Sequence, residues 1–158
     1  MSIKKVKDYL SKFNLENKVL EFEVSSATVK LAAEAIGCAE AEIAKSLTFN
    51  VFDKPVMIVC AGDMKVDNSK FKAQFQTKAK MLTFEEVENM IGHTVGGVCP
   101  FAVNDSVEVF LDESLKRFNI VYPACGSSNS AIGLSVEELK HVSQNFLGFV
   151  DVCKKIEN

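Results

Sequence analysis

The sequence predicts an α+β fold, in which one domain over residues 1–158 carries a mixed, strongly curved β-sheet flanked by helices. The length of 158 residues is that of one ordinary domain. The content of 47% hydrophobic and 25% charged residues lies in the globular range and provides for a packed core. Strand signals are separated by short helices without strict βαβ alternation, which favours a mixed sheet over a purely parallel one.

Two helices and one strand are predicted before residue 40. Apolar residues at helical spacing indicate an amphipathic first helix, namely Ile3, Val6, Leu10 and Phe13. Apolar and acidic residues largely alternate over Val19–Val24, which is typical of a half-buried strand. Thr28 is expected to cap a second helix, which ends at Gly37.

The middle of the chain predicts a β-hairpin. A short helical turn over Glu40–Ala44 leads into Lys45–Phe52, whose β-branched and aromatic residues favour a strand. Asp53–Pro55 has the composition of a turn. The continuous apolar run Val56–Ala61 indicates a second strand that is buried on both faces.

Three helices and four strands are expected in the remaining part. Asp67 or Asn68 is expected to cap the first of these helices. Thr83 and Ser135 each open a capping box for a further helix. The helix after Thr83 has an apolar face of Phe84, Val87 and Ile91 and ends at Gly92, and the helix after Ser135 carries His141. Strands are predicted at Val107–Leu111, Ile120–Tyr122, Ala131–Leu134 and Phe146–Val152.

The composition excludes several classes of protein. No pair of the five cysteines has CxxC spacing, so neither a zinc site nor a redox motif is expected, and no metal or cofactor is implied. Free thiols favour a reducing compartment, and we expect the cytoplasm. No apolar run reaches the length of a membrane span. The net charge of −3 argues against tight binding along a nucleic-acid backbone such as DNA, but allows binding of one RNA end through a local basic patch.

The glycine-rich segment Gly92–Phe101 is the most unusual part of the sequence. The pair Gly96-Gly97 permits backbone angles that other residues avoid and lets a ligand approach the main chain. Pro100 fixes the direction of the chain. Such a loop can offer N–H groups to a carbonyl or an anionic oxygen, and the alternative is a plain tight turn.

Two further places are candidates for a site, and each also has an ordinary structural explanation. The small polar segment Cys125–Ser130 lines a pocket or forms a surface loop. Lys45 begins an apolar strand, where a lysine is often only a solvated end residue. His93 and Cys99 are close enough in sequence for a Cys–His pair, but the neighbouring Pro100 and Phe101 favour a small packed cysteine.

Together these segments resemble the YbaK family, whose domain also occurs as the editing insertion of bacterial prolyl-tRNA synthetases. The resemblance covers nearly the whole chain after the first helix and depends on the order and spacing of its pieces. They are Ser26–Val29, Ala32–Gly37, Ile43–Phe49, Ala61–Asp63, Val66-Asp67, Gly92–Phe101, Gly126–Ser130 and Glu137–Leu139. The resemblance implies a mixed, barrel-like sheet flanked by helices.

It also implies an activity. Family members hydrolyse the ester between a wrong amino acid and a tRNA, usually the tRNA for proline, with the help of a ribose hydroxyl of the terminal adenosine. The family's lysine matches Lys45, which would hold the terminal phosphate region, and its GxxxP element matches Gly96–Pro100, whose backbone would position the scissile carbonyl. The residues then expected to bind substrate are Thr28, Ser46, Gly97, Val98, Pro100, Phe101, Gly126, Ser127 and Ser128.

The sequence departs from the family at two points. Many members have a second proline at the position of Cys99, and a basic residue within the segment that matches Gly126–Ser130. The amino acid that is removed therefore cannot be carried over from any one subfamily. The tRNA acceptor end is the expected partner, and prolyl-tRNA synthetase is a second one. A non-catalytic binding module and a hydrolase that uses Cys99 are the alternatives.

Overall fold

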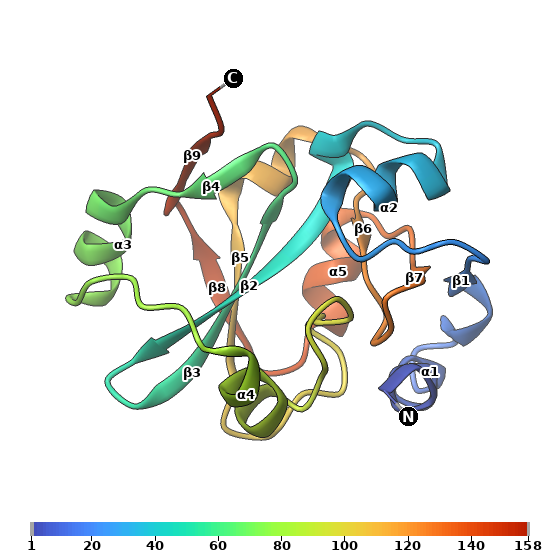
Figure 1. The fold of residues 1–158 in the computed structure, drawn as a ribbon, viewed down its shortest axis with the longest axis horizontal. Coiled ribbons are helices and arrows are strands. Elements are labelled where there is room, and N and C mark those ends of the chain that lie inside the picture. The colour runs from blue at the N-terminus through green and yellow to red at the C-terminus, as the bar shows by residue number, and fades with distance from the viewer. Residues whose placement is uncertain (1, 158) are drawn as a thin grey trace.

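A five-stranded curved sheet lies at the centre of the computed structural model, which describes residues 2–157. Its strand order is β6-β2-β3-β5-β8. The strands are β2 (Ile43–Val51), β3 (Lys54–Ala61), β5 (Glu108–Asp112), β6 (Tyr122–Pro123) and β8 (Phe146–Val150). Strands β2 and β3 are antiparallel, whereas β6, β5 and β8 join their neighbours in parallel. The predicted mixed sheet is thereby confirmed, and it curls into a half-barrel (Figure 1).

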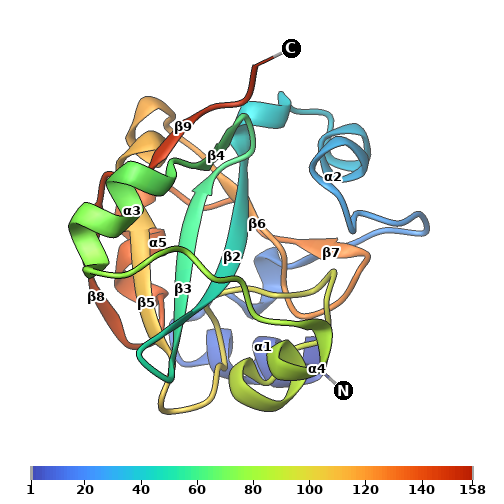
Figure 2. The ribbon, with the colours of Figure 1, turned by 60° about the vertical axis from the view of Figure 1, so that its left-hand side comes forward.

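Short ribbons and helices surround this sheet (Figures 1 and 2). One ribbon pairs β1 (Leu20–Glu21) with β7 (Ser130–Ala131), and the other pairs β4 (Met64–Val66) with β9 (Cys153–Lys155). The helices are α1 (Ser2–Ser11), α2 (Val29–Ile36), α3 (Asn68–Phe75), α4 (Phe84–Glu86) and α5 (Val136–Val142). Single 3₁₀ segments span Glu16–Lys18, Glu40–Glu42 and Glu113–Arg117, and a π-helical turn over Val87–Ile91 continues α4. Within residues 2–157 no helix has the length and apolar character needed to cross a membrane.

Strand β3 is buried on both faces, as its apolar run predicts. Its side chains alternate between two cores, because successive residues of a strand point to opposite faces. Met57 and Val59 belong to the larger core, to which α1 contributes Val6 and Leu10. Val56, Ile58 and Cys60 belong to the smaller core under α3, which contributes Phe71.

The helix caps follow the sequence closely. The side chains of Thr28, Asp67, Thr83 and Ser135 each accept a hydrogen bond from a main-chain N–H in the first turn of α2, α3, α4 and α5. Gly37 and Gly92 end their helices in the left-handed conformation, which glycine adopts without a steric penalty.

The exact extent of several strands was predicted wrongly. Only Leu20–Glu21 of the predicted strand Val19–Val24 pairs with another strand. The hairpin turn is formed by Phe52-Asp53, both with positive φ (50° and 65°), so that Lys54 and Pro55 already belong to β3. The predicted last strand Phe146–Val152 ends at Val150, and β9 follows after a break.

For the helix after Thr83, one side chain was assigned to the wrong environment. Phe84 was expected on the buried face with Val87 and Ile91, but its side chain is 75% exposed. Val87 and Ile91 are buried as expected. Phe84 is the first residue of α4 and precedes the π-helical turn Val87–Ile91, which holds the buried residues of this helix.

Two loops that are far apart in sequence meet at Gly97. A Cβ atom added at Gly97 would lie 2.5 Å from the carbonyl carbon of Gly126 and 2.6 Å from the Ser127 nitrogen. Gly126 in turn packs on α1, because a Cβ there would lie 2.7 Å from the Ser2 oxygen. The Lys5 Nζ atom of α1 also donates to the Gly92 carbonyl (2.6 Å). Helix α1 therefore contacts both the loop that begins at Gly92 and the loop that contains Gly126.

We expect Gly97→Ala to destabilise the fold by about 1–3 kcal/mol, the usual effect of adding an atom to a closely packed site. The obstructing atoms belong to the backbone, so no side-chain rotation can relieve the clash. Urea unfolding measures the effect. Val95→Ala, at a half-exposed position of the same loop, should change the stability by less than about 0.5 kcal/mol. Equal stability of the two variants would contradict the contact.

Asp112 joins the end of β5 to two other segments. It is buried, and its two carboxylate oxygens accept hydrogen bonds from the main-chain N–H groups of Ser114 (2.9 Å) and Val152 (3.0 Å). We expect Asp112→Ala to lower the free energy of unfolding by about 2–4 kcal/mol, because it leaves two buried donors without partners. The control is Asp105→Ala, at an exposed aspartate, which urea unfolding should show to be nearly neutral.

Candidate functional site

A cavity of about 240 Å³ opens beside β2, between α2 and α4. Figure 2 shows these three elements around the open side of the sheet, with β7 on the remaining side. Five segments of the chain contribute residues to the walls, namely Ser26–Ala32, Ile43–Thr48, Met81–Val87, Val95–Val98 and Tyr122–Ala131. Hydroxyl groups of serine and threonine line it together with small apolar side chains.

The cavity adjoins a gap in the hydrogen bonding along one edge of β2. At one end of the gap, Ala44 pairs with Pro123 of β6. At the other end, the Asn50 N–H donates to the Lys80 carbonyl (2.8 Å), and the Leu82 N–H donates to the Thr48 carbonyl (3.1 Å). Neither neighbour extends along β2 between these points.

Ser46 lies in the middle of this gap. Main-chain groups of successive residues in a strand point to alternate edges. Since Thr48 and Asn50 use theirs on the cavity edge, the alternation places those of Ser46 on the same edge. Within residues 2–157 no neighbouring segment pairs with them there. The gap therefore presents one N–H and one C=O group to a ligand.

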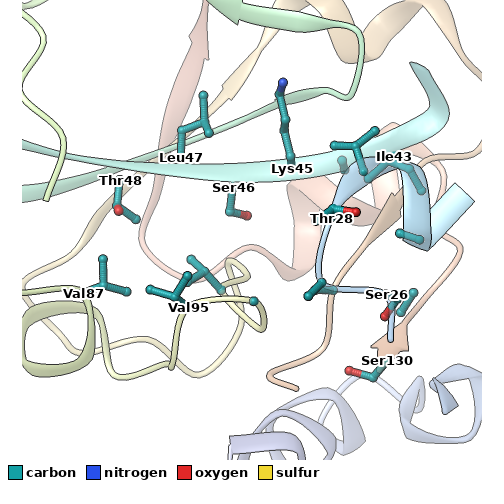
Figure 3. Close-up of a pocket in the computed structure, with 18 of the residues that line it drawn as sticks. Ser26, Thr28, Ile43, Lys45, Ser46, Leu47, Thr48, Val87, Val95 and Ser130 are labelled. Carbon is teal, nitrogen blue, oxygen red and sulfur yellow. The ribbon is translucent and has the colours of Figure 1, made fainter. Parts of the chain in front are cut away.

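The Ser46 side chain adds a second polar group. Its Oγ atom is buried, and no hydrogen-bond partner for it exists in the part of the chain that the structure describes. In Figure 3 the side chains of Ser46 and Thr48 point from β2 towards Val87 and Val95 across the cavity. A buried hydroxyl without a partner is unfavourable, so this atom is suited to a polar group of a ligand.

Lys45 points to the other side of the strand. Figure 3 shows its side chain directed away from Ser46 and Thr48. The half-buried Lys45 reaches the Gly62 carbonyl with its Nζ atom at 3.4 Å, a long and weak hydrogen bond. Its ammonium group is therefore held loosely at the border of the cavity rather than inside it.

The glycine-rich loop forms the opposite wall with Gly96 and Val98. Gly96 has φ +101°, a conformation that favours glycine. The Gly97 N–H group is already used in a turn, where it donates to the Thr94 carbonyl (3.1 Å). The N–H groups of Gly96 and Val98 have no acceptor among residues 2–157, so the donors of this wall are those two and not Gly97.

Pro100 and Phe101, which were expected to bind substrate, do not line the cavity. Phe101 is fully buried in the larger core and packs near Tyr9, with 6.3 Å between the ring centroids. The Pro100 carbonyl accepts from the Gln144 N–H (2.9 Å). These contacts give both residues an anchoring position at the end of the loop.

The loop Gly126–Ser130 supports the cavity from behind. Of its residues only Ser130 lines the cavity, while Gly126, Ser127 and Ser128 lie outside it. The Ser127 hydroxyl donates a hydrogen bond to the Ser130 Oγ atom (2.8 Å), and the Ser128 carbonyl accepts one from the Ser26 N–H (2.7 Å). The loop thus holds Ser26 and Ser130, which line the cavity together with Ser46 (Figure 3).

Thr28 has two roles in the structure. It lines the cavity as expected, and its hydroxyl also caps α2 by accepting from the Leu31 N–H (3.2 Å). Several lining residues were not among those expected to bind substrate, for example Ser26, Thr48, Met81, Phe84 and Val95, and Ser130 was expected only as part of the segment Cys125–Ser130. Thr48 could have been found, because it lies two residues after Ser46 on the same strand and so shares its face.

The Cys99–His93 pair is packed in the core and away from the cavity lining. The Cys99 Sγ atom lies 3.6 Å from the His93 Nε2 atom. That nitrogen is 2.7 Å from the Phe101 carbonyl and so carries the proton. Burial raises the pKa of Cys99 to about 12 and lowers the pKa of His93. A fully buried neutral thiol is a poor nucleophile, so the packed-cysteine interpretation holds.

Lys45 and Tyr122 are the ionisable side chains of the cavity wall within the described residues. Among residues 2–157 the lining includes no Asp, Glu, His or Cys. Groups of three or more possible metal ligands are also absent from this part of the chain. The site offers placement, hydroxyls and main-chain donors.

Known proteins resemble this chain in sequence and in fold. The model of the aminoacyl-tRNA editing domain matches residues 23–142, and thus every segment that lines the cavity. The chain is 51% identical to the uncharacterized protein YwhH of Bacillus subtilis (strain 168), over 99% of the chain and 100% of YwhH. It is 33% identical to a proline--tRNA ligase of Halalkalibacterium halodurans over 104 residues, which are 65% of the chain but only 18% of that ligase.

A solved structure shows the same fold. It is the crystal structure of a candidate trans-editing enzyme for prolyl tRNA synthetase, with a TM-score of 0.87, 27% identity and 97% coverage of both chains. The matched region of the family model makes up most of the sequence and contains the whole cavity. On this evidence the chain belongs to the aminoacyl-tRNA editing domain family.

Proposed function

We propose that the chain hydrolyses the ester between a small, wrong amino acid and the 3′ end of a tRNA. Membership of the editing-domain family supports this reaction class. The tRNA for proline is the proposed substrate, since one relative is a proline--tRNA ligase and the solved neighbour is described as a trans-editing enzyme for prolyl tRNA synthetase. As in that neighbour's description, the reaction would take place in trans.

The observation that carries the proposal is the pair of polar walls around the cavity. One wall is the open edge of β2 with the N–H, C=O and Oγ groups of Ser46. The other wall has the free N–H groups of Gly96 and Val98. Main-chain donors held by surrounding structure stabilise the negative charge that develops on the carbonyl oxygen during ester hydrolysis, and such donors each contribute roughly 10²–10³-fold in rate.

The residue types that line the cavity favour a reaction in which a group of the substrate itself helps to activate the water. Water must be activated for attack on the ester, and the lining within the described residues has no carboxylate or imidazole to accept its proton. The Lys45 side chain points away from Ser46 and Thr48 (Figure 3). The ribose hydroxyl next to the ester is the proposed group that orients the water. The protein then contributes by holding the ester, the hydroxyl and the donors in one geometry.

The size of the cavity limits the amino acid. A volume of about 240 Å³ must contain the aminoacyl group and the nearest part of the ribose. Ala32 and Ile43 narrow the apolar part, whereas hydroxyls line the rest. We therefore propose alanine, cysteine and serine as the side chains to be tested, and large side chains as excluded by size.

We expect Ser46→Ala to lower kcat/KM for alanyl-tRNA(Pro) by about tenfold, the loss of one hydrogen bond to the substrate. The stability of the free protein should stay the same or rise, because the variant removes a buried hydroxyl without a partner. Deacylation of radiolabelled alanyl-tRNA and urea unfolding measure the two quantities. Unchanged turnover would argue against Ser46 as a substrate-binding residue.

Lys45→Ala should lower kcat/KM by about tenfold or more, if its ammonium binds a phosphate of the acceptor end. The matched control is Cys99→Ala, which should deacylate at a rate near that of the unaltered protein in its folded fraction, because Cys99 is buried outside the cavity. A loss confined to Cys99→Ala would favour the thiol hydrolase. Binding of the aminoacyl-tRNA without turnover would favour the non-catalytic module.

A further inference from the structure

Three large apolar side chains surround the mouth of the cavity, and all are unusually exposed. Phe84, Met81 and Val95 have exposed fractions of 75%, 58% and 44%, and each contributes to the cavity lining. We call these three residues the rim. Isolated exposed apolar residues are common on proteins, but several of them around a cavity mark a binding surface.

Phe84 is the least expected of the three. It lies at the first position of α4, where its spacing to Val87 and Ile91 predicts burial. None of the aromatic pairs formed within residues 2–157 includes its ring. The Thr83 capping box fixes the start of the helix. The Glu86 N–H donates to the Thr83 hydroxyl (3.2 Å), and the Thr83 N–H donates to the Glu86 carboxylate (2.9 Å). An exposed ring is thus held on an ordered segment.

The charges on the two sides of Phe84 differ. The segment before it carries Lys78 and Lys80, which are exposed and have no carboxylate within salt-bridge distance among residues 2–157. The residues after it include Glu85 and Glu88, which are exposed and acidic. A phosphate would therefore be attracted to the side of the lysines and repelled from the other side.

The backbone brings the lysine segment to the site. In Figure 2 the chain after α3 crosses β3 and β2 before it enters α4. Its main chain is bonded to β2, through Lys80 to Asn50 and through Leu82 to Thr48, at the end of the gap that presents Ser46. The lysines and the rim therefore have a fixed position relative to the cavity.

We propose that the rim is a stacking platform for the base of the nucleotide that carries the ester, with Phe84 under the base and Lys80 near the phosphate of that nucleotide. This inference rests on the proposed function. Base and ester are attached to the same ribose, so a base bound beside an ester in the cavity must lie at its mouth. Stacking on an aromatic ring accepts any base, and the lysine supplies the charge complementary to the phosphodiester.

The test of the platform uses two stable ligands and five proteins, the unaltered chain included. The first ligand is 3′-alanylamino-3′-deoxyadenosine, in which an amide replaces the ester. The second ligand is the same compound without its adenine base. Titration calorimetry compares the unaltered chain with Phe84→Ala, Phe84→Leu and Phe84→Tyr. Phe52→Ala is the matched control, because Phe52 is 69% exposed at the tip of the β2–β3 hairpin and does not line the cavity.

We expect Phe84→Ala and Phe84→Leu to bind the adenosine compound at least about fivefold more weakly, from the lower range of base–aromatic stacking. Phe84→Tyr and Phe52→Ala should bind as the unaltered chain does, and all proteins should bind the compound without the base alike. Full affinity in Phe84→Leu would overturn stacking and favour a general apolar contact, such as one with a protein partner. Equal weakening for both ligands would show a merely structural role.

Lys80 is tested separately with aminoacyl-tRNA. Lys80→Ala should reduce the magnitude of the slope of log affinity against log salt by about 0.7, the value for one phosphate contact on a single strand. Lys12→Ala, at an exposed lysine directly after α1, should leave the slope unchanged. An unchanged slope in Lys80→Ala would contradict the phosphate contact. If the unaltered chain deacylates tRNA but the Phe84 and Lys80 variants behave as it does, only this inference fails. If the unaltered chain neither deacylates tRNA nor binds the adenosine compound, the proposed function fails.

Discussion

The site depends on the interruption of main-chain pairing along one edge of β2. Strand β6 bonds to the beginning of this edge and the segment before α4 bonds to its later part, so that Ser46 is left between them. A strand edge in solution attracts other strands, and proteins normally cover it. Here the gap is enclosed by α2, α4 and the glycine-rich loop instead, which makes it a cavity with polar main-chain groups on its floor.

Close contact between backbones holds the opposite wall in place. The loop that contains Gly96 rests on Gly126 because Gly97 has no side chain, and Gly126 rests on α1 for the same reason. Phe101 anchors the end of the loop in the larger core. The two halves of the cavity are thereby fixed by different means: β2 by its hydrogen bonds to β3, and the loop by contacts that only glycine permits.

Much of this structure could be predicted from the sequence, because the relevant signals are local. The caps at Thr28, Asp67, Thr83 and Ser135 each depend on residues three positions away, and the buried strand Val56–Ala61 depends on its own composition. The glycine-rich loop was also found, since a Gly-Gly pair followed by proline is locally unusual.

What could not be predicted depends on contacts between distant segments. Nothing near Ser46 in the sequence shows that its edge is left free, because this follows from where β6 and Lys80–Leu82 stop. Phe84 was assigned to the core by α-helical spacing, but it is the first residue of α4 and lies exposed at the mouth of the cavity. Pro100 and Phe101 were expected to bind substrate from the resemblance over Gly92–Phe101, but both are buried and neither lines the cavity. The resemblance alone did not separate lining residues from anchoring ones.

The placement of polar main-chain groups on both walls has a consequence for how such a protein can change over generations. A backbone N–H is present whatever side chain its residue carries, so point substitutions at Ala32, Ile43 or Thr48 can reshape the cavity while the donors at Ser46 and Gly96 persist. The shape of the cavity and its main-chain donors can then change independently of each other. A pocket built in this way can acquire a new ligand preference by gradual mutation while its donors stay in place.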